Sequence, residues 1–130
     1  MNAPSRYEMF VLADGEPKVL VDEDTKIPNA ATLTINKEDH TLANMLRSHL
    51  LLQPTVLFCG YQVPHPLESK VVIKIQTDGS KTPIVAVQDA LNSLVLLLGK
   101  IRTTFHNEVI KKRALEGEGD GFGGADGGFY

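Results

Sequence analysis

The sequence predicts an α+β two-layer sandwich, in which a mainly antiparallel sheet packs against a short helix and a long C-terminal helix. Several short segments alternate apolar and polar residues, which is the period of half-buried strands. Two other segments place apolar residues at helical spacing, so each has one apolar stripe. These segments follow one another in the order β–(β)–β–α–β–β–α, which favours strands in one layer and helices in the other.

Length and composition set the domain organisation. The chain has 130 residues and a hydrophobic content of 42%, which suits one domain with a packed core. Seven of the last fifteen residues are glycine, and four others are acidic. Such a segment cannot bury enough surface to fold. We therefore expect one domain over residues 1–115 and a flexible, acidic, glycine-rich tail over residues 116–130.

The N-terminal third contains the weaker strand signals. Residues 7–12 form a short apolar stretch, and residues 18–21 form a possible short strand. Residues 22–30 are acidic and rich in turn-forming residues, with a proline that breaks regular structure. Residues 31–35 then alternate three apolar residues with two threonines, and this pattern predicts a half-buried strand.

A helix is expected from Asp39 to Leu52. Its apolar residues lie at i, i+3, i+4 and i+8, namely Leu42, Met45, Leu46 and Leu50. Pro54 ends it. Asp39 and His40 could in principle form a base and its orienting acid. Asp39 is instead well placed as an N-cap at the positive end of the helix dipole, so we interpret the pair as a helix start.

The second half of the chain predicts two strands and a long helix. Residues 56–63 and 71–77 are rich in β-formers and are separated by the loop of a wide hairpin. Thr82 as N-cap and Pro83 at the first helical position begin a helix that continues to about Leu115. Such a helix is on the order of 50 Å long at roughly 1.5 Å per residue.

The long helix has more apolar surface than one sheet can cover. Its apolar residues are spaced alternately three and four apart, which is a heptad seam: Ile84, Val87, Leu91, Leu94, Leu98, Ile101 and Phe105. Residues 95–97 are apolar as well and lie off this seam. The helix is either a well-buried core helix, or it packs one face on the sheet and another on a partner helix. Gly99 either marks a close helix crossing or is simply tolerated.

The polar residues give no catalytic or cofactor motif. Cys59, the one cysteine, lies in an expected strand and suits a core thiol, and the four histidines show no metal spacing. Without residues 116–130 the chain has 13 basic and 12 acidic residues, so its body is nearly neutral. Residues 111–113 are the one basic run, which suits a solvated helix end better than a nucleic-acid or acidic-partner contact. We expect no cofactor, no metal, no sequence-specific nucleic-acid binding and no membrane span, and an intracellular location.

Three stretches together resemble a known family. KEDHTLANMLRSHLL, VLFCGYQVPHPLESKVVIKIQT and the long terminal helix are similar to the small alpha-like subunits of eukaryotic RNA polymerase II, and so is the opening MNAPSRYEMF. The resemblance covers about residues 1–113. Ala43 stands where the family often has glycine, and the tail has no counterpart.

The resemblance implies a non-catalytic, nuclear subunit. It implies a dimerisation domain related to the N-terminal domain of bacterial alpha, whose partner is the larger alpha-like subunit and whose dimer carries the large catalytic subunits. Both helices would pack on the partner's helices through Leu42, Met45 and Leu46 together with the heptad seam. Asn44 and Arg47 match motif positions associated with the partner and a large subunit. From pattern alone Arg47 is either solvated or a docking contact. The equivalent subunit of polymerases I and III, and a small enzyme or ligand-binding domain, are the alternatives.

Overall fold

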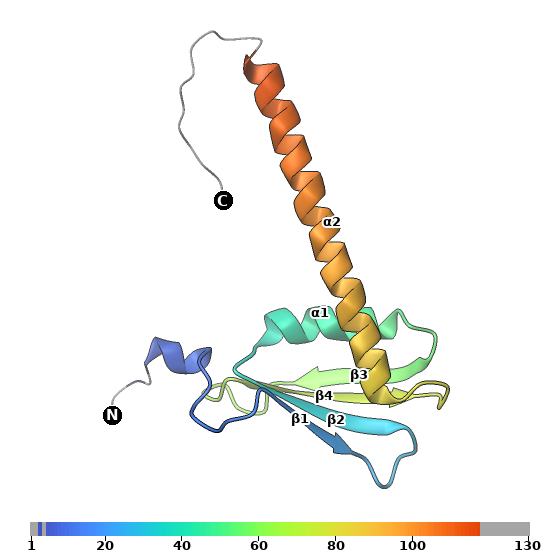
Figure 1. The fold of residues 1–130 in the computed structure, drawn as a ribbon. Coiled ribbons are helices and arrows are strands. Elements are labelled where there is room, and N and C mark those ends of the chain that lie inside the picture. Colours follow the sequence, from blue (N-terminus) through green and yellow to red (C-terminus); the bar gives the residue numbers. More distant parts are fainter. Residues whose placement is uncertain (1–2, 4, 118–130) are drawn as a thin grey trace. The chain divides into compact units, whose positions relative to one another are not determined.

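A four-stranded antiparallel sheet forms one layer of the fold (Figure 1). The computed structural model describes residues 3 and 5–117. The strands lie in the order β1-β2-β4-β3, and their bounds are β1 (Val19–Glu23), β2 (Ala30–Asn36), β3 (Val56–Gln62) and β4 (Lys70–Thr77). Before them comes η1 (Arg6–Met9), a short 3-10 helix with no buried residue.

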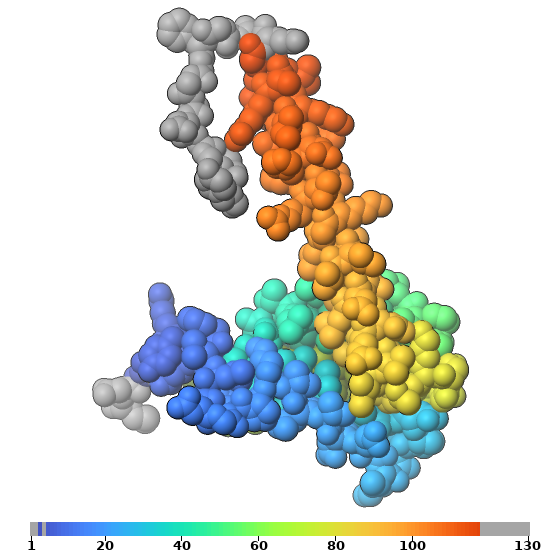
Figure 2. All heavy atoms as spheres, viewed as in Figure 1, coloured from blue at the N-terminus to red at the C-terminus, as the bar shows by residue number. Residues whose placement is uncertain are grey.

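Two helices, α1 (His40–Leu51) and α2 (Pro83–Gly117), follow β2 and β4 in the chain. Figure 1 shows α1 and the first turns of α2 on the same face of the sheet. The chain divides into two compact units, one ending at Leu94 and the other beginning at Val95, so the division falls within α2. The first turns of α2 pack closely on the other elements of the first unit (Figure 2).

The core lies between the sheet and these helices. Antiparallel pairing sets Leu33 opposite Ile73 and Ile35 opposite Val71, so the alternating apolar residues of β2 and β4 share one face. The helices add apolar side chains at i, i+3, i+4 and i+7 or i+8. The buried helical residues are Ala43, Leu46 and Leu50 in α1 and Ala86, Val87, Ala90 and Leu94 in α2.

The start of α1 follows from local chemistry. Lys37 adopts a positive φ of 60° and turns the chain out of β2. Asp39 is the N-cap in extended conformation, and its carboxylate accepts the Thr41 backbone N–H at 2.9 Å. That hydrogen bond to the charged form lowers the pKa of Asp39. The interpretation of Asp39 as a capping residue is confirmed.

The expected α+β two-layer fold is confirmed, and the predicted strands and helices differ from the observed bounds by at most two residues. The apolar stretch at residues 7–12 is partly taken up by η1 rather than by a strand. Residues 116–117, which we placed in the tail, are the last of α2. The rest of the expected tail, residues 118–130, lies outside the described residues.

Candidate functional site

Burial divides α2 into a shorter first part that packs in the core and a longer second part that is exposed. Ala86, Val87, Ala90 and Leu94 are buried in the core, at the spacing of one helix face. From Val95 to Gly117 no side chain is buried, and Val109 alone is half-buried. The helix therefore contributes to its own domain over about three turns.

Large apolar side chains continue along α2 after burial ends. The exposed ones are Val95, Leu96, Leu97, Leu98, Ile101, Phe105, Ile110 and Leu115. Leu96 is 76% exposed and Phe105 is 70% exposed. Covering a side chain of this size contributes on the order of 1.5–3 kcal/mol. Exposed apolar side chains in such number are typical of interaction surfaces, and we call these eight residues the α2 apolar surface.

The structure separates the expected partner-binding residues by accessibility. Leu46, Val87 and Leu94 are enclosed by the chain's own core. Ile84 and Leu91 are each 40% exposed, and the later seam residues Leu98, Ile101 and Phe105 are more exposed. Leu42 and Met45 are partly buried at the edge of the core.

Three strongly exposed residues of α2, namely Val95, Leu96 and Leu115, were missing from the expected set. Val95 and Leu96 lie off the heptad seam, so a prediction based on heptad spacing does not include them. The apolar character of residues 95–97 on all sides of the helix was the signal that could have identified them. Leu52, just after α1, is also 76% exposed. A Cβ built on Gly99 would meet no atom within 4 Å, so no described part of the chain approaches the helix closely there. If Gly99 marks a close helix crossing, the crossing helix must therefore belong to a partner protein, and this stays a prediction.

A polar cluster lies on one flank of α1. The Arg47 Nη2 atom donates a hydrogen bond to Asn44 Oδ1 at 2.7 Å, and the Arg47 Cζ atom lies 5.4 Å from the centre of the Tyr61 ring. Arg47 and Met45 differ by two residues, which is about 200° around a helix. The two expected contact residues therefore lie on opposite flanks of α1. The flank that carries Arg47 is the one next to Tyr61 of β3.

His40 belongs to this same cluster. Its Nδ1 atom lies 2.9 Å from the Tyr61 hydroxyl oxygen, and the two rings meet edge to face with centroids 5.5 Å apart. The carboxylate of Asp39 is occupied by the backbone of Thr41. The neighbouring acid and imidazole therefore make different structural contacts.

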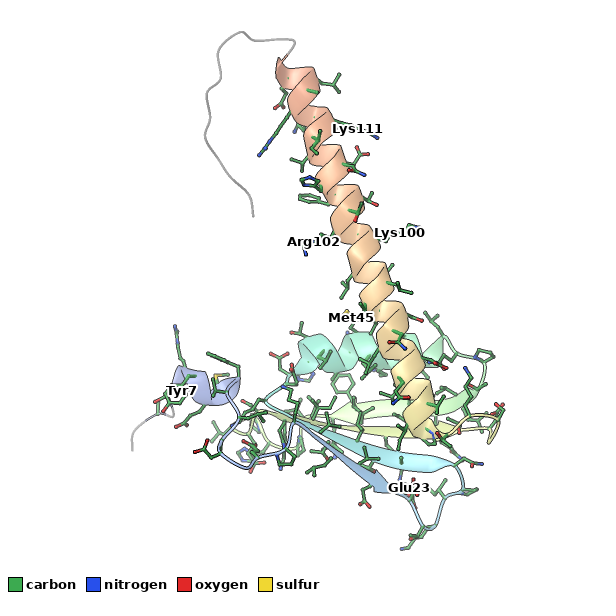
Figure 3. All side chains as sticks on the ribbon, viewed as in Figure 1. Tyr7, Glu23, Met45, Lys100, Arg102 and Lys111 are labelled. Atoms are coloured by element: carbon green, nitrogen blue, oxygen red, sulfur yellow. The ribbon has the colours of Figure 1, made fainter. Side chains whose placement is uncertain are left out.

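The remaining chemical candidates have ordinary explanations. Burial raises the pKa of the Cys59 thiol to about 11, which keeps it protonated at neutral pH. Lys111 and Lys112 pair with Glu108 and Glu116 of the same helix. The side chains of Lys100 and Lys111 leave α2 on one side, and that of Arg102 leaves it on the other (Figure 3). Within residues 3 and 5–117, no group of three or more His, Cys, Asp or Glu residues could hold a metal ion.

Two open hollows exist in the first unit. One, of about 360 Å³, lies between the end of α1 and α2, with the Lys81–Asp89 ion pair among its lining residues. The other, of about 430 Å³, includes Phe58 and Gly60 of the edge strand β3. The titratable residues that line the first hollow are His49, Lys81 and Asp89, and those that line the second are Tyr61 and Lys74.

By length and composition alone, α2 could cross a membrane. An 18-residue window of it has a mean hydropathy of 1.6, and 22% of that window is buried in the protein. A core helix of a water-soluble protein can meet the same criterion, so this single helix is weak evidence. The expected absence of a membrane span is therefore not established by composition.

Comparison with known proteins identifies the domain. Residues 30–104 match the RNA polymerase Rpb3/Rpb11 dimerisation domain. The DNA-directed RNA polymerase II subunit rpb11 of Dictyostelium discoideum is 46% identical over 113 residues, which cover 87% of this chain and 94% of that protein. A probable DNA-directed RNA polymerase II subunit RPB11 of Caenorhabditis elegans is 47% identical over 120 residues, which cover 91% of this chain and 95% of that protein.

A solved structure supports the same fold. The crystal structure of DNA-directed RNA polymerase subunit L from Thermoplasma acidophilum superimposes with a TM-score of 0.60 at 24% identity, over 74% of this chain and 90% of that one. The resemblance noted in the sequence is confirmed. The chain belongs to the family of the RNA polymerase Rpb3/Rpb11 dimerisation domain.

Proposed function

We propose that this chain is a non-catalytic assembly subunit of DNA-directed RNA polymerase II. It pairs with the larger alpha-like subunit, and the dimer forms the platform for the large catalytic subunits in mRNA transcription. The names of its relatives and the dimerisation domain over residues 30–104 support this proposal. A nuclear location follows from it.

One observation carries the proposal. The match to the dimerisation domain continues to residue 104, whereas burial along α2 ends at Leu94. The first ten residues of the second unit therefore belong to a dimerisation domain and present exposed apolar side chains. A partner that covers them would gain about 25 cal/mol for each Å² of apolar surface removed from water.

The accessible residues of the expected set form the proposed contact. Leu98, Ile101 and Phe105 contact the partner directly, and the half-exposed Ile84 and Leu91 lie at its margin. Leu42 and Met45 contribute from α1. The enclosed residues Leu46, Val87 and Leu94 act indirectly, because they hold the two helices on the sheet.

A protein partner explains α2 better than a bilayer does. A membrane-spanning helix needs about 20 predominantly apolar residues in lipid. The first turns of α2 are already packed in the core, so residues 83–94 are not available for lipid. After Ile101 the helix carries Arg102, His106 and Glu108 within two turns. The apolar stretch that remains is too short to span a bilayer.

Two other functions make different predictions. The equivalent small subunit of polymerases I and III would have the same fold and a different set of large subunits, and the names of the relatives do not favour it. A small enzyme or ligand-binding domain would need convergent polar groups in a pocket, and the two hollows do not provide them.

The deciding experiment is purification of the tagged full chain from cells, followed by identification of the associated subunits. We expect the larger alpha-like subunit together with the large catalytic subunits of polymerase II. Recovery of the polymerase I or III large subunits would identify the alternative complex. The assembly function would be ruled out if the purified chain were a stable monomer and the chain in cell extract had the same monomeric mass.

A further inference from the structure

Arg47 carries a positive charge that the described chain does not neutralise. The guanidinium is only partly exposed, and within residues 3 and 5–117 it belongs to no ion pair. Among the described residues it donates one hydrogen bond, to Asn44, and its buried Nε atom has no acceptor there. A partly buried cation is unfavourable unless a charge of opposite sign is placed near it.

Tyr61 fixes this guanidinium from the neighbouring strand. Its ring lies 5.4 Å from Arg47 Cζ, within the range of a cation–π contact. The tyrosine is itself held at its far end, because its hydroxyl group is hydrogen-bonded to His40 Nδ1 at 2.9 Å. The ring of His40 meets it edge to face at an interplanar angle of 65°. Arg47 is therefore held by Asn44 and by Tyr61, and Tyr61 by His40.

We propose that Tyr61 is a positioning residue, which orients the Arg47 guanidinium so that it binds a carboxylate on another protein of the polymerase assembly. The inference rests on the proposed function. It adds a residue from β3 that spacing on α1 alone does not reveal, and it assigns structural roles to Asn44 and His40. A planar guanidinium binds a carboxylate through two parallel hydrogen bonds, and an immobilised one loses less conformational freedom on binding.

The place of Arg47 on α1 indicates which partner it meets. Arg47 lies about 200° around the helix from Met45, which is on the flank proposed to face the larger alpha-like subunit. Its neighbours Asn44 and Ser48 are exposed. The carboxylate therefore belongs to a large catalytic subunit rather than to the dimer partner. A nucleic-acid phosphate is the less suitable ligand, because the body of the chain is nearly neutral and has no basic stripe of the kind that nucleic-acid-binding domains use.

The test uses polymerase isolated through the tagged full chain and washed with increasing salt. The measured quantity is the fraction of large catalytic subunits retained relative to the larger alpha-like subunit. Tyr61→Leu keeps a smaller apolar side chain but removes the ring, and Tyr61→Phe keeps the ring but removes the hydroxyl group. Arg47→Met, alone and combined with Tyr61→Leu, completes a double-mutant cycle.

For Tyr61→Leu we expect about two- to fivefold weaker retention of the large subunits, the change that a cation–π contact at a partly exposed site supports. Tyr61→Phe should restore retention to near the wild-type level. Arg47→Met should weaken retention further and reduce its salt dependence, and adding Tyr61→Leu to it should cause no additional loss. Nuclease treatment should leave all these values unchanged.

Several results would overturn the inference. These are losses from Tyr61→Leu and Arg47→Met that multiply as independent effects, a Tyr61→Phe variant as defective as Tyr61→Leu, or retention abolished by nuclease. If Tyr61→Leu lowers recovery of the folded dimer, Asn44→Ala replaces it, because that variant removes the other contact that orients Arg47. Failure of the wild-type chain to recover the larger alpha-like subunit would instead refute the proposed function. This result is obtained with the wild type alone, so it is distinct from any result that concerns Tyr61.

Discussion

The Nδ1 atom of His40 lies 2.9 Å from the hydroxyl oxygen of Tyr61, a residue 21 positions later in the chain. This contact, rather than one to the adjacent Asp39, determines what the imidazole does. It joins the first turn of α1 to the edge strand β3, beside the core. His40 therefore contributes to the orientation of Tyr61.

His40→Ala is expected to change stability slightly and partner recovery hardly at all. The substitution removes one hydrogen bond at an exposed position, which contributes at most about 1 kcal/mol. Denaturant unfolding of the purified heterodimer at a fixed protein concentration measures the effect. A loss of several kcal/mol, or complete loss of the larger alpha-like subunit, would contradict the assigned role.

Asp39 makes the stability of α1 depend on pH in the acid range. Its pKa is lowered in the folded state from the ordinary value of 3.8, chiefly because the carboxylate accepts the Thr41 backbone N–H. A group with a lowered folded pKa stabilises the fold above its unfolded pKa, and this contribution is lost as the pH falls through the folded pKa. The capping contribution should thus be complete at pH 7 and should decline below about pH 4.

Two substitutions separate the cap from the charge. Asp39→Ala should destabilise the protein at pH 7 and approach the wild type at low pH, because the wild type loses the same contribution there. Asp39→Asn can still cap the helix but does not titrate, so it should keep most of the stability and lose its pH dependence. Equal acid sensitivity of Asp39→Asn and the wild type would show that other groups control it.

Cys59 should react with thiol reagents only when the protein opens. Burial raises its pKa to about 11, so thiolate is scarce near neutral pH, and the side chain is enclosed in the core. It is the sole cysteine of the chain, so labelling reports on a single position. We expect slow labelling of the native protein at pH 7.5 and fast labelling in denaturant. Rapid native labelling would mean that β3 is open or that the thiol is activated.

Leu94→Ala should destabilise the fold rather than a surface. Leu94 is 4% exposed and is the last residue of α2 in the core, so truncation leaves a cavity. Removing a buried leucine side chain in this way costs about 2–5 kcal/mol. Leu98→Ala, one turn later and 48% exposed, should cost much less in the isolated chain. Equal losses of unfolding free energy in the two variants would contradict the observed end of burial.

The sequence predicted the elements well because each rests on a local signal. The cap at Asp39, the alternation over residues 31–35 and Pro83 at the start of α2 depend only on near neighbours. The heptad seam correctly indicated excess apolar surface. It could not indicate which seam residues the chain itself covers. That depends on the residue of α2 at which packing against the core ends, which is Leu94.

The Arg47 cluster could not be predicted from spacing. Tyr61 is 14 residues beyond Arg47 and in a different element, so no helical or strand period connects them. Their contact depends on how α1 is placed across β3, which is a property of the packed core. Position in the sequence alone left Arg47 with two interpretations, a solvated side chain or a docking contact, and the contact to Tyr61 is the observation on which the proposed docking role rests.

The strongest prediction concerns Leu98→Glu on the α2 apolar surface. Leu98 is exposed in the described chain, so a carboxylate there is solvated and the domain should fold normally. In the proposed dimer the same position is buried, where an unpaired charge costs several kcal/mol. Recovery of the larger alpha-like subunit should therefore fall at least about a hundredfold, since each 1.4 kcal/mol is a factor of ten.

Asn107→Glu provides the matched control for this prediction. It introduces the same charge into the same helix, but position 107 lies about 180° around α2 from position 98 and carries a polar residue in the native chain. It should leave recovery of the partner within about twofold, which corresponds to the usual effect of a surface substitution. If both variants lose the partner equally, general destabilisation of α2 explains the loss. If neither does, the partner contacts another part of the molecule, and α2 must be covered by something else.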